Sequence, residues 1–575
     1  MSFDAATDIE LVPQETTKSM STAAVAADAA ELEESSAMLY SDSNSDCHET
    51  MMPARSIDSF MDDAFDATTI DLGRMTWSSY AKTFVRQWNY WAVVLCMGVC
   101  NSSDATEILA LSYVLGLGEK SDFASEILEN DLSRNGGVLA CSIFLGMLIG
   151  GGVVGVFGDM YGRKKIVLYG LILNGSAGVL SATAVDLITL ASARFVAGIG
   201  IGGSIPPLFA LAAEIAPRKC RGLVISIIAS FWMVGSIFTS VLAFCSFGLT
   251  YTLSWRIFLT ICSFPSIIGA ALVYYNVPES PRFLLRTGRS YESAQITNKL
   301  AQKIGYHCPF PLTPGELSHN LVELPYTENE TSRNFIAASR DGIRGVLSLY
   351  NFDIKVCQTT LVAQSIWFTI SFGSYGLITW INAIFRQINL GNIYFDSLLF
   401  SFSNLPGNIL SASLVDRYGR KNMLITSLAS ASLSVLLFAF SVNLSDMESV
   451  RPYLIVFCAC SFQAFSVSGW NIIGVLTSES FPTKVRSTGV GICSSSGRIG
   501  SMIAQLVNGA LIDQPTRLLM VSATLLLAGA IVTFYLPKDM SMQPLQDSYV
   551  TPSISTTHEG SFSKRRKSDG YTSIT

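Results

Sequence analysis

Twelve long apolar stretches, separated by polar loops, constrain the fold of this chain more than any other feature of its sequence. A stretch of about 20 apolar residues is long enough to cross about 30 Å of hydrocarbon as an α-helix. We expect such helices at residues 90–116, 137–157, 166–185, 188–213, 222–247, 256–277, 356–384, 396–415, 422–442, 452–478, 488–512 and 517–536. The chain has 575 residues and is 49% hydrophobic but only 14% charged. Because one aqueous core does not require so much apolar surface, the sequence predicts an all-α membrane protein.

A short charged motif occurs once in each half of the chain. The first copy, GVFGDMYGRKK, ends at Lys165, and the second, DRYGRKN, begins at Asp416. Each copy lies between two apolar stretches, so a unit of six stretches is repeated. Membrane proteins with two related halves are often secondary transporters, with the solute site near the middle of the membrane. We therefore expect twelve transmembrane helices in two pseudosymmetric six-helix bundles.

Polar segments divide the chain into five parts. The predicted parts are a disordered acidic tail (1–87), a first bundle (88–277), an inter-bundle loop (278–355), a second bundle (356–537) and a second disordered tail (538–575). Within the loop, residues 291–304 have a helical pattern. Lys and Arg collect in the short loops on one side, which by the positive-inside rule places both tails and the inter-bundle loop in the cytosol. Either the plasma membrane or an intracellular vesicle membrane fits this topology.

Several classes of function are excluded by what the sequence lacks. The 12 cysteines lie mostly inside apolar stretches, without a CxxC pair or a Cys/His cluster, so we expect no metal site. No nucleophile, base and orienting group converge in a polar segment, so we expect neither an enzyme nor a cofactor. The basic residues are scattered among loops, and no nucleic-acid module is present. The expected partners are a small-molecule substrate, protons and membrane lipid.

Three further charged motifs accompany the repeated loop. They are Glu214-x-x-Pro217-x-x-x-Arg221-Gly222, its counterpart Glu479-x-x-Pro482-x-x-x-Arg486, and Pro278-Glu279-Ser280-Pro281-Arg282. With the repeated loop, they resemble motifs of the major facilitator superfamily, and the resemblance covers residues 88–537. Within this region, DATE at 104–107, SYGLITW at 374–380, LPGN at 405–408 and SGRIG at 496–500 resemble the synaptic-vesicle-2-like and organic-ion-transporter branch. The seventh stretch departs from the glutamine-rich pattern of sugar porters, because it offers only Gln364 followed by SIWFTISFGSYG.

By this resemblance, the loop charges are gating residues and not substrate ligands. They are Asp159, Arg163, Glu214 and Arg221 in the first half, and Asp416, Arg420, Glu479 and Arg486 in the second. Glu214 and Arg221 supply charges complementary to those of Asp159 and Arg163 from neighbouring helices. Such a cluster would latch the cytosolic side shut in one state and release it in another. The alternative is that the basic residues only enforce topology.

Three ionisable residues lie inside the first and fourth stretches, where a charge persists only if it is paired or faces a water-filled cavity. Asp104 and Glu107 share one helical face, and Asp104 lies about 20 Å from the cytosolic end of its helix. Arg194 enters from the opposite side to a depth of about 10 Å. We expect Asp104 to pair with Arg194 and to carry a transported proton, as the equivalent residues do in sugar and organic-ion members. A static structural pair is the alternative, and Glu107 either shares the proton or contacts a cationic substrate.

Candidate substrate ligands lie in the seventh, tenth and eleventh stretches. Arg498 is about 15 Å into its helix, where it would bind a carboxylate or phosphate, or pair with an unidentified acid. The other candidates are Gln364, Phe368, Phe372, Tyr375, Trp380 and Trp470. Helical spacing places three of these aromatic residues on one stripe, which suits a flat or cationic substrate. Ordinary helix packing explains the same spacing.

These observations predict a proton-coupled secondary transporter that moves a small organic ion or an aromatic or carboxylic acid by alternating access. Two alternatives remain open. One is a hexose carrier of the sugar-porter type, and the other is a vesicle membrane protein that binds a partner without net transport.

Overall fold

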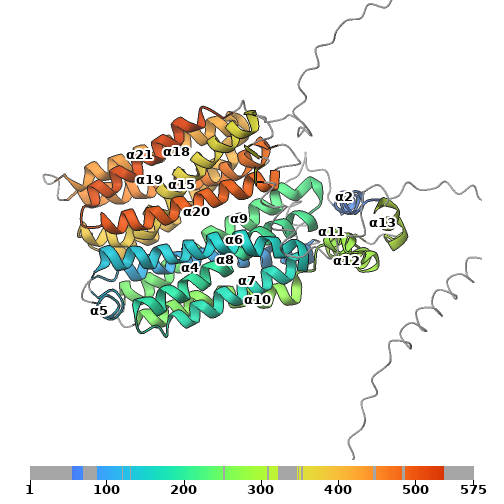
Figure 1. Cartoon of the computed structure of the whole chain (residues 1–575), viewed down its shortest axis with the longest axis horizontal. Helices are drawn as coiled ribbons and strands as arrows, with labels where there is room; N and C mark the ends of the chain where they lie inside the picture. The colour runs from blue at the N-terminus through green and yellow to red at the C-terminus, as the bar shows by residue number, and fades with distance from the viewer. Residues whose placement is uncertain are drawn as a thin grey trace, which may run out of the picture. The chain divides into compact units, whose positions relative to one another are not determined.

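The computed structural model describes residues 55–68, 87–118, 121–129, 131–249, 253–306, 310–321, 346–347, 349–350, 354–444, 449–481 and 486–536. All of these residues belong to one compact unit, Arg55–Thr575. Every regular element that they form is helical (Figure 1). The predicted all-α fold is therefore confirmed. The second predicted tail, at 538–575, lies outside the described residues.

Six long helices form the first bundle. They are α4 (Trp88–Leu115), α6 (Gly137–Tyr161), α7 (Arg163–Ser181), α8 (Leu187–Ile215), α9 (Arg221–Ala243) and α10 (Trp255–Asn276). Two π-helical turns extend them, since η2 (Leu132–Gly136) leads into α6 and η4 (Phe244–Leu249) continues α9. Each helix begins and ends within a few residues of the predicted stretch.

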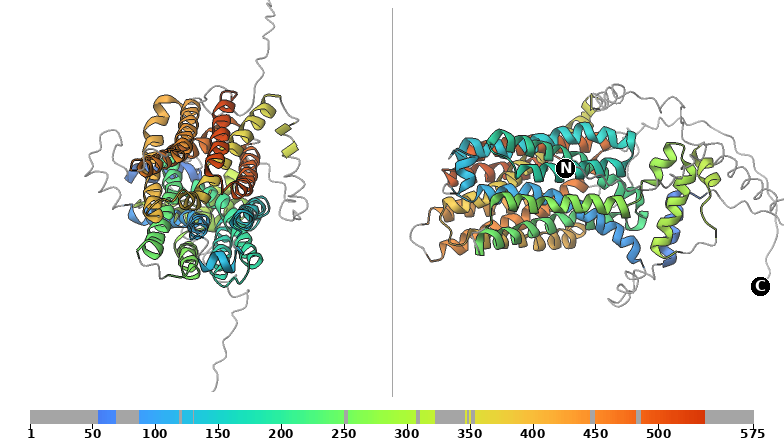
Figure 2. Two further views of the ribbon diagram at one scale, coloured as in Figure 1. Left: turned by 90° about the vertical axis from the view of Figure 1, so that its left-hand side faces the viewer. Right: turned by 90° about the horizontal axis from the view of Figure 1, so that it is seen from below.

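The second bundle repeats this arrangement, with one of its helices broken. Its helices are α15 (Ile354–Gln387), α16 (Ile393–Phe402), α17 (Asn404–Tyr418), α18 (Arg420–Val442), α19 (Arg451–Ser480), α20 (Arg486–Ala510) and α21 (Pro515–Thr533). The eighth predicted stretch corresponds to α16 and α17, which are separated at Ser403. Seen end-on, the two bundles lie on opposite sides of the unit (Figure 2).

Ten helical segments among the described residues are long and apolar enough to cross a membrane. The remaining two helices of the bundles, α7 and α20, contain 19 and 25 residues and are long enough to span, but they are more polar. In α7 the reason is the Arg163–Lys165 run, and in α20 it is a high content of serine and glycine.

Shorter helices gather at the two ends of the bundles. At the end where α4 and α15 begin, which we call the tail side, lie α2 (Ile57–Thr68), η3 (Arg218–Cys220), α11 (Pro281–Arg286), α12 (Ser290–Ile304) and α13 (Pro314–Leu321) (Figure 1). Helix α12 confirms the helical pattern predicted at 291–304. At the opposite end, which we call the far side, lies α5 (Asp122–Glu126).

Helix α2 corrects the prediction of a disordered tail over residues 1–87. Its apolar residues Ile57, Phe60, Met61, Ala64 and Phe65 recur every three or four positions and are buried. A 12-residue amphipathic segment is too short to be stable by itself in water, but it folds when its apolar face packs on a partner. The tertiary contacts of α2 with α12 and η3 provide that partner.

Small residues in the glycine-rich segment at 198–203 allow α8 to pack closely between α6 and α7. A Cβ atom on Gly198 would overlap the carbonyl oxygen of Ile143 in α6. On the opposite face, a Cβ atom on Gly200 would lie 2.6 Å from the carbonyl oxygen of Gly170 in α7. Backbones that approach this closely exclude larger side chains.

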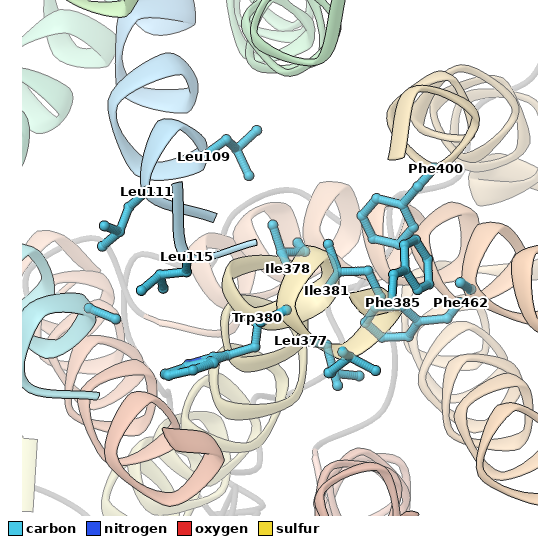
Figure 3. Close-up of a cluster of buried hydrophobic side chains, with 14 of the residues drawn as sticks. Leu109, Leu111, Leu115, Leu377, Ile378, Trp380, Ile381, Phe385, Phe400 and Phe462 are labelled. Carbon is cyan, nitrogen blue, oxygen red and sulfur yellow. The ribbon is translucent and has the colours of Figure 1, made fainter. Parts of the chain in front are cut away.

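The two bundles meet mainly through α4 with α15 and α6 with α20. On the far side, Leu111 and Leu115 of α4 lie near Ile378 and Trp380 of α15 in a buried apolar cluster (Figure 3). These side chains exclude water from the contact between the bundles.

Candidate solute-binding cavity

A cavity of about 210 Å³ lies between the two bundles and is lined by α4, α8 and α9 of the first and by α15, α17 and α19 of the second. Its lining combines side-chain amides with aromatic rings. The amides are Asn101, Asn404, Asn408, Gln463 and Asn471, and the aromatic residues are Phe209, Trp232, Tyr375 and Trp470. None of the described lining side chains is charged.

Hydrogen bonds fix the amides of the second bundle in place. The Gln463 amide Nε2 donates to Asn404 Oδ1 over 2.8 Å, and the Asn471 amide Nδ2 donates to Asn408 Oδ1 over 2.8 Å. Oε1 of Gln463 is buried and accepts no hydrogen bond from the residues that the structure describes. Buried polar atoms are usually paired. Gln463 therefore offers a free acceptor at the wall of the cavity.

The aromatic wall is rigid because its rings contact one another edge to face. The centroid of the Trp470 ring lies 5.3 Å from that of Tyr375 and 5.7 Å from that of Trp367. The Trp367 indole donates to Thr477 Oγ1 over 2.9 Å, which fixes the outermost ring of the three. Tyr375 and Trp470, both predicted as ligands, thus line the cavity.

Four other predicted ligands lie away from the cavity in this conformation. Phe368 and Phe372 stack on each other with a centroid distance of 6.4 Å. Trp380 is buried and donates to Gln505 Oε1 over 2.9 Å, and Gln364 accepts a hydrogen bond from Tyr350. Helix α15 also packs against α20 and α21, so only part of its aromatic stripe reaches the cavity.

Arg194 pairs with Glu107, so the predicted pairing of Arg194 with Asp104 is wrong. Arg194 Nη1 lies 2.7 Å from Glu107 Oε2, and both side chains are fully buried. Glu107 is three residues beyond Asp104 on the same face, and its longer side chain reaches the depth of Arg194. Gly178 of α7 makes room for this carboxylate, because a Cβ atom there would overlap Glu107 Oε1 and the Ser263 hydroxyl.

A different cation, which comes from the second bundle, acts electrostatically on Asp104. Oδ1 of Asp104 is buried and has no hydrogen-bond partner among the described residues. The positive charge that acts on this carboxyl group is that of Arg498 in α20. The Arg498 guanidinium also lies 5.7 Å from the centre of the Tyr375 ring. Arg498 therefore lies behind the aromatic wall, where it connects the charged layer to the cavity.

Ion pairs on the tail side repeat in the two bundles. Arg163 Nε lies 2.9 Å from Glu214 Oε2, and Arg420 Nε lies 3.1 Å from Glu479 Oε2. The first pair lies within the first bundle, and the second lies within the second bundle. The side chains of Asp159 and Asp416 are outside the described residues.

Two further predicted gating residues have other partners. Arg221 Nη2 lies 3.3 Å from Asp58 of α2, and Arg486 donates to the carbonyl oxygen of Phe481 over 3.4 Å. The sequence did not predict Asp58 as a gating residue, because Asp58 belongs to the segment predicted to be disordered.

The hydrogen bonds that the structure describes between the bundles lie in the middle and on the far side. Asn382 Nδ2 donates to Ser112 Oγ over 2.9 Å, and the Arg386 guanidinium donates to the carbonyl oxygen of Gly116 over 2.6 Å. Outside this seal, on the far side, a second hollow of about 700 Å³ is lined by residues that include Arg386, Asp131 and Asp513. The amide cavity is therefore closed off from the far side.

Sequence reasoning missed these amides because, apart from Gln364 and the aromatic residues, it weighed only charged groups inside the apolar stretches. An uncharged amide also costs free energy in an apolar environment unless it is hydrogen-bonded. Asn101, Asn404 and Gln463 all lie in or between apolar runs. That signal was available in the sequence.

Two six-helix bundles around a central cavity, with a repeated charged motif at one end, define a membrane transporter of the major facilitator fold. The chain belongs to the sugar (and other) transporter family, whose model matches residues 101–547.

Individual relatives support the same placement. Synaptic vesicle glycoprotein 2C of Mus musculus is 24% identical, with 78% of each chain covered. Organic cation/carnitine transporter 7 of Arabidopsis thaliana is 29% identical, over 78% of this chain and 91% of its own length. Among solved structures, the partially occluded inward-open xylose transporter XylE from E. coli is similar, with a TM-score of 0.60 and 15% identity. That match covers 79% of this chain and 99% of the transporter, and it supports the fold.

Proposed function

We propose that this protein transports a small, neutral, polar organic solute of the sugar or polyol class by alternating access. The observation that carries the proposal is the central cavity, whose described lining offers amide donors and acceptors and aromatic faces but no charge. Hydroxyl groups match side-chain amides in both directions of hydrogen bonding, and a ring with C–H faces packs on indole and phenol rings. This choice replaces the organic ion favoured from the sequence.

The position of Arg498 argues against a cation as the solute. Its guanidinium already lies over the Tyr375 ring, so a second positive charge in the cavity would be repelled. An organic cation is nevertheless the second candidate. The cavity contains Trp232 and Trp470, which favour cation–π contacts, and a relative is named an organic cation/carnitine transporter.

Transport would proceed by rocking of the two bundles about the cavity. The seal at Ser112, Asn382 and Arg386 closes the far side, so the conformation described is one in which solute leaves or enters from the tail side. By the positive-inside rule the tail side is cytosolic, and both termini are cytosolic with it. Either the plasma membrane or a vesicle membrane would house the protein, and the similarity to a synaptic vesicle glycoprotein favours the vesicle.

Proton coupling would use the charged layer behind the cavity. Asp104 is buried with an unpartnered oxygen, whereas Glu107 and Arg194 neutralise each other. Asp104 and Arg498 belong to different bundles, so rocking would change their separation. A carboxyl group whose surroundings change in this way can bind a proton in one state and release it in the other.

Uptake into liposomes that contain the purified protein tests the substrate class. The panel would hold a pentose, a hexose, a polyol, a quaternary ammonium compound and a monocarboxylate, each with and without an imposed pH gradient. Uptake of a sugar or polyol in preference to both ions supports the proposal. Uptake of the quaternary ammonium compound alone would replace it with the second candidate, and no uptake by folded protein would favour a vesicle protein without transport activity.

Paired glutamine variants test the cavity itself. Gln463→Leu removes the unpartnered acceptor, and we expect KM to rise about tenfold, equivalent to about 1.4 kcal/mol. Gln364→Leu is the matched control, since Gln364 lies on α15 outside the cavity, and we expect less than a twofold change in KM. A larger effect from Gln364 than from Gln463 would place the solute elsewhere.

Asp104→Asn tests the coupling. We expect pH-driven accumulation to be lost while exchange of solute across the membrane without a gradient continues. Accumulation equal to that of the unmodified protein would remove Asp104 as the proton carrier.

A further inference from the structure

Helix α2 has two chemically distinct faces. One face is apolar and buried, and the other carries four aspartates at positions 58, 62, 63 and 66. Its N-terminus is held by a reciprocal pair of hydrogen bonds. The Ser59 amide donates to Ser56 Oγ over 3.1 Å, and the Ser56 amide donates to Ser59 Oγ over 3.0 Å. The helix is thus capped at the point where its apolar face begins.

The apolar face fastens α2 to the helices on the tail side. The Phe60 ring contacts the Tyr306 ring edge to face, with a centroid distance of 6.3 Å. At the C-terminal end of α2, the Thr68 hydroxyl accepts a hydrogen bond from Gln87 Nε2 over 3.0 Å. Gln87 is the residue just before α4 begins. Figures 1 and 2 show α2 beside α11, α12 and α13.

The acidic face binds the basic loop between α8 and α9. Asp58 lies 2.6 Å from Arg218 Nη2 and 3.3 Å from Arg221 Nη2, and it also pairs with Arg282 of α11. Asp62 Oδ1 accepts the backbone N–H of Arg218 over 2.7 Å, and Asp66 pairs with Lys219.

Asp58 is the centre of this contact. Burial by itself would raise the pKa of Asp58, but the hydrogen bond from Arg218 and the charges of Arg282 and Arg218 hold it below the ordinary value. The carboxylate is therefore stabilised in its charged form. One carboxylate that joins three guanidinium groups connects the α8–α9 loop to the start of the inter-bundle loop.

We propose that α2 is a built-in acidic ligand of this basic loop, and that it slows closure of the tail side. Arg221 belongs to the predicted gating set, and an arginine held by Asp58 is less available to a carboxylate of the second bundle. The conformation described fits this proposal, because its far side is sealed and the Arg163–Glu214 and Arg420–Glu479 pairs on the tail side each lie within one bundle. Release of α2 would free Arg221 and speed the return to the opposite conformation. The effect on turnover rests on the proposed transport function, whereas the docking of α2 does not.

Hydrogen exchange on the full chain in liposomes tests the docking. The test variant is Asp58→Asn with Asp66→Asn, which removes the ion pairs and keeps the apolar face. The matched control is Asp63→Asn, an exposed aspartate of α2 that makes no ion pair in the part of the chain that the structure describes. We expect exchange of the amides in residues 57–68 to be at least tenfold faster in the double variant and to change less than twofold in the control. Unchanged protection in the double variant would overturn the docking by charge.

A second readout follows opening of the far side without requiring net transport. Ser112 is 1% exposed in the far-side seal, so a Ser112→Cys probe reacts with an aqueous maleimide only when that side opens. Labelling is read by peptide mass spectrometry, because the chain has 12 cysteines of its own. We expect at least threefold faster labelling when α2 is released by the double substitution. If α2 is released but the labelling rate is unchanged, the proposal that α2 slows closure of the tail side is overturned. This result would stand even if the protein transported none of the solutes in the uptake panel.

Discussion

Replacing Glu107 with leucine leaves Arg194 charged and without its carboxylate in a fully buried position. Two unit charges about 4 Å apart attract each other by about 4 kcal/mol at an effective dielectric constant of about 20. Measured losses when one partner of a buried pair is removed are of the same size, about 3–5 kcal/mol. We therefore expect Glu107→Leu to lower the free energy of unfolding by about 3–5 kcal/mol, measured by SDS-induced unfolding in mixed micelles.

A double-mutant cycle separates the ion pair from other effects. Removing both charges in Glu107→Leu with Arg194→Met leaves no uncompensated charge, so most of the lost stability should return. Asp104→Asn breaks no ion pair that the structure describes and should cost about 1 kcal/mol or less. Additive losses for Glu107 and Arg194, or a larger loss for Asp104→Asn than for Glu107→Leu, would refute the pairing.

Two further predictions concern Gly178 and the docking of α2. Gly178→Ala should displace Glu107 and lower the initial uptake rate at least tenfold, whereas Gly222→Ala, with open space around its Cβ position, should change it less than twofold. The pKa of Asp58 is lowered, so its contribution is present above about pH 3.9 and is lost as pH falls through the folded-state value. The pKa of Lys219 is raised by its hydrogen bond with Asp66, so its contribution is present below about pH 10.4 and is lost at still higher pH. Protection of α2 against hydrogen exchange, corrected for the intrinsic rate, should therefore be constant between about pH 5 and pH 9 and fall in 1 M salt, and a transition near neutral pH would contradict these pairings.

For the aromatic residues of α15, the sequence predicts a shared side of the helix but not which of them reach the cavity. Helical spacing correctly places Phe368, Phe372 and Tyr375 along one side of α15, since spacing follows from the geometry of one helix. It does not say which neighbour covers each part of that side. In the fold, Tyr375 reaches the cavity, while Phe368 and Phe372 stack on each other.

The charged layer shows the same division. The sequence predicts the depth of Asp104, Glu107 and Arg194 from the rise of a helix, and depth alone leaves two acids within reach of one arginine. Rotation of α4 about its axis decides between them, and that rotation depends on how the helix packs against α7 and α10. Packing therefore pairs Arg194 with Glu107, and the charge that acts on Asp104 is that of Arg498.

The sequence by itself determined the membrane helices and their division into two bundles, because hydrophobic length acts within one helix. Only the tertiary structure decided which amides meet at the cavity, which acid neutralises Arg194 and where α2 binds. The amides Asn101 and Gln463 are more than 300 positions apart, and Asp58 and Arg282 are separated by 224. Contacts at such distances along the chain arise from the packing of whole helices, which no local pattern encodes.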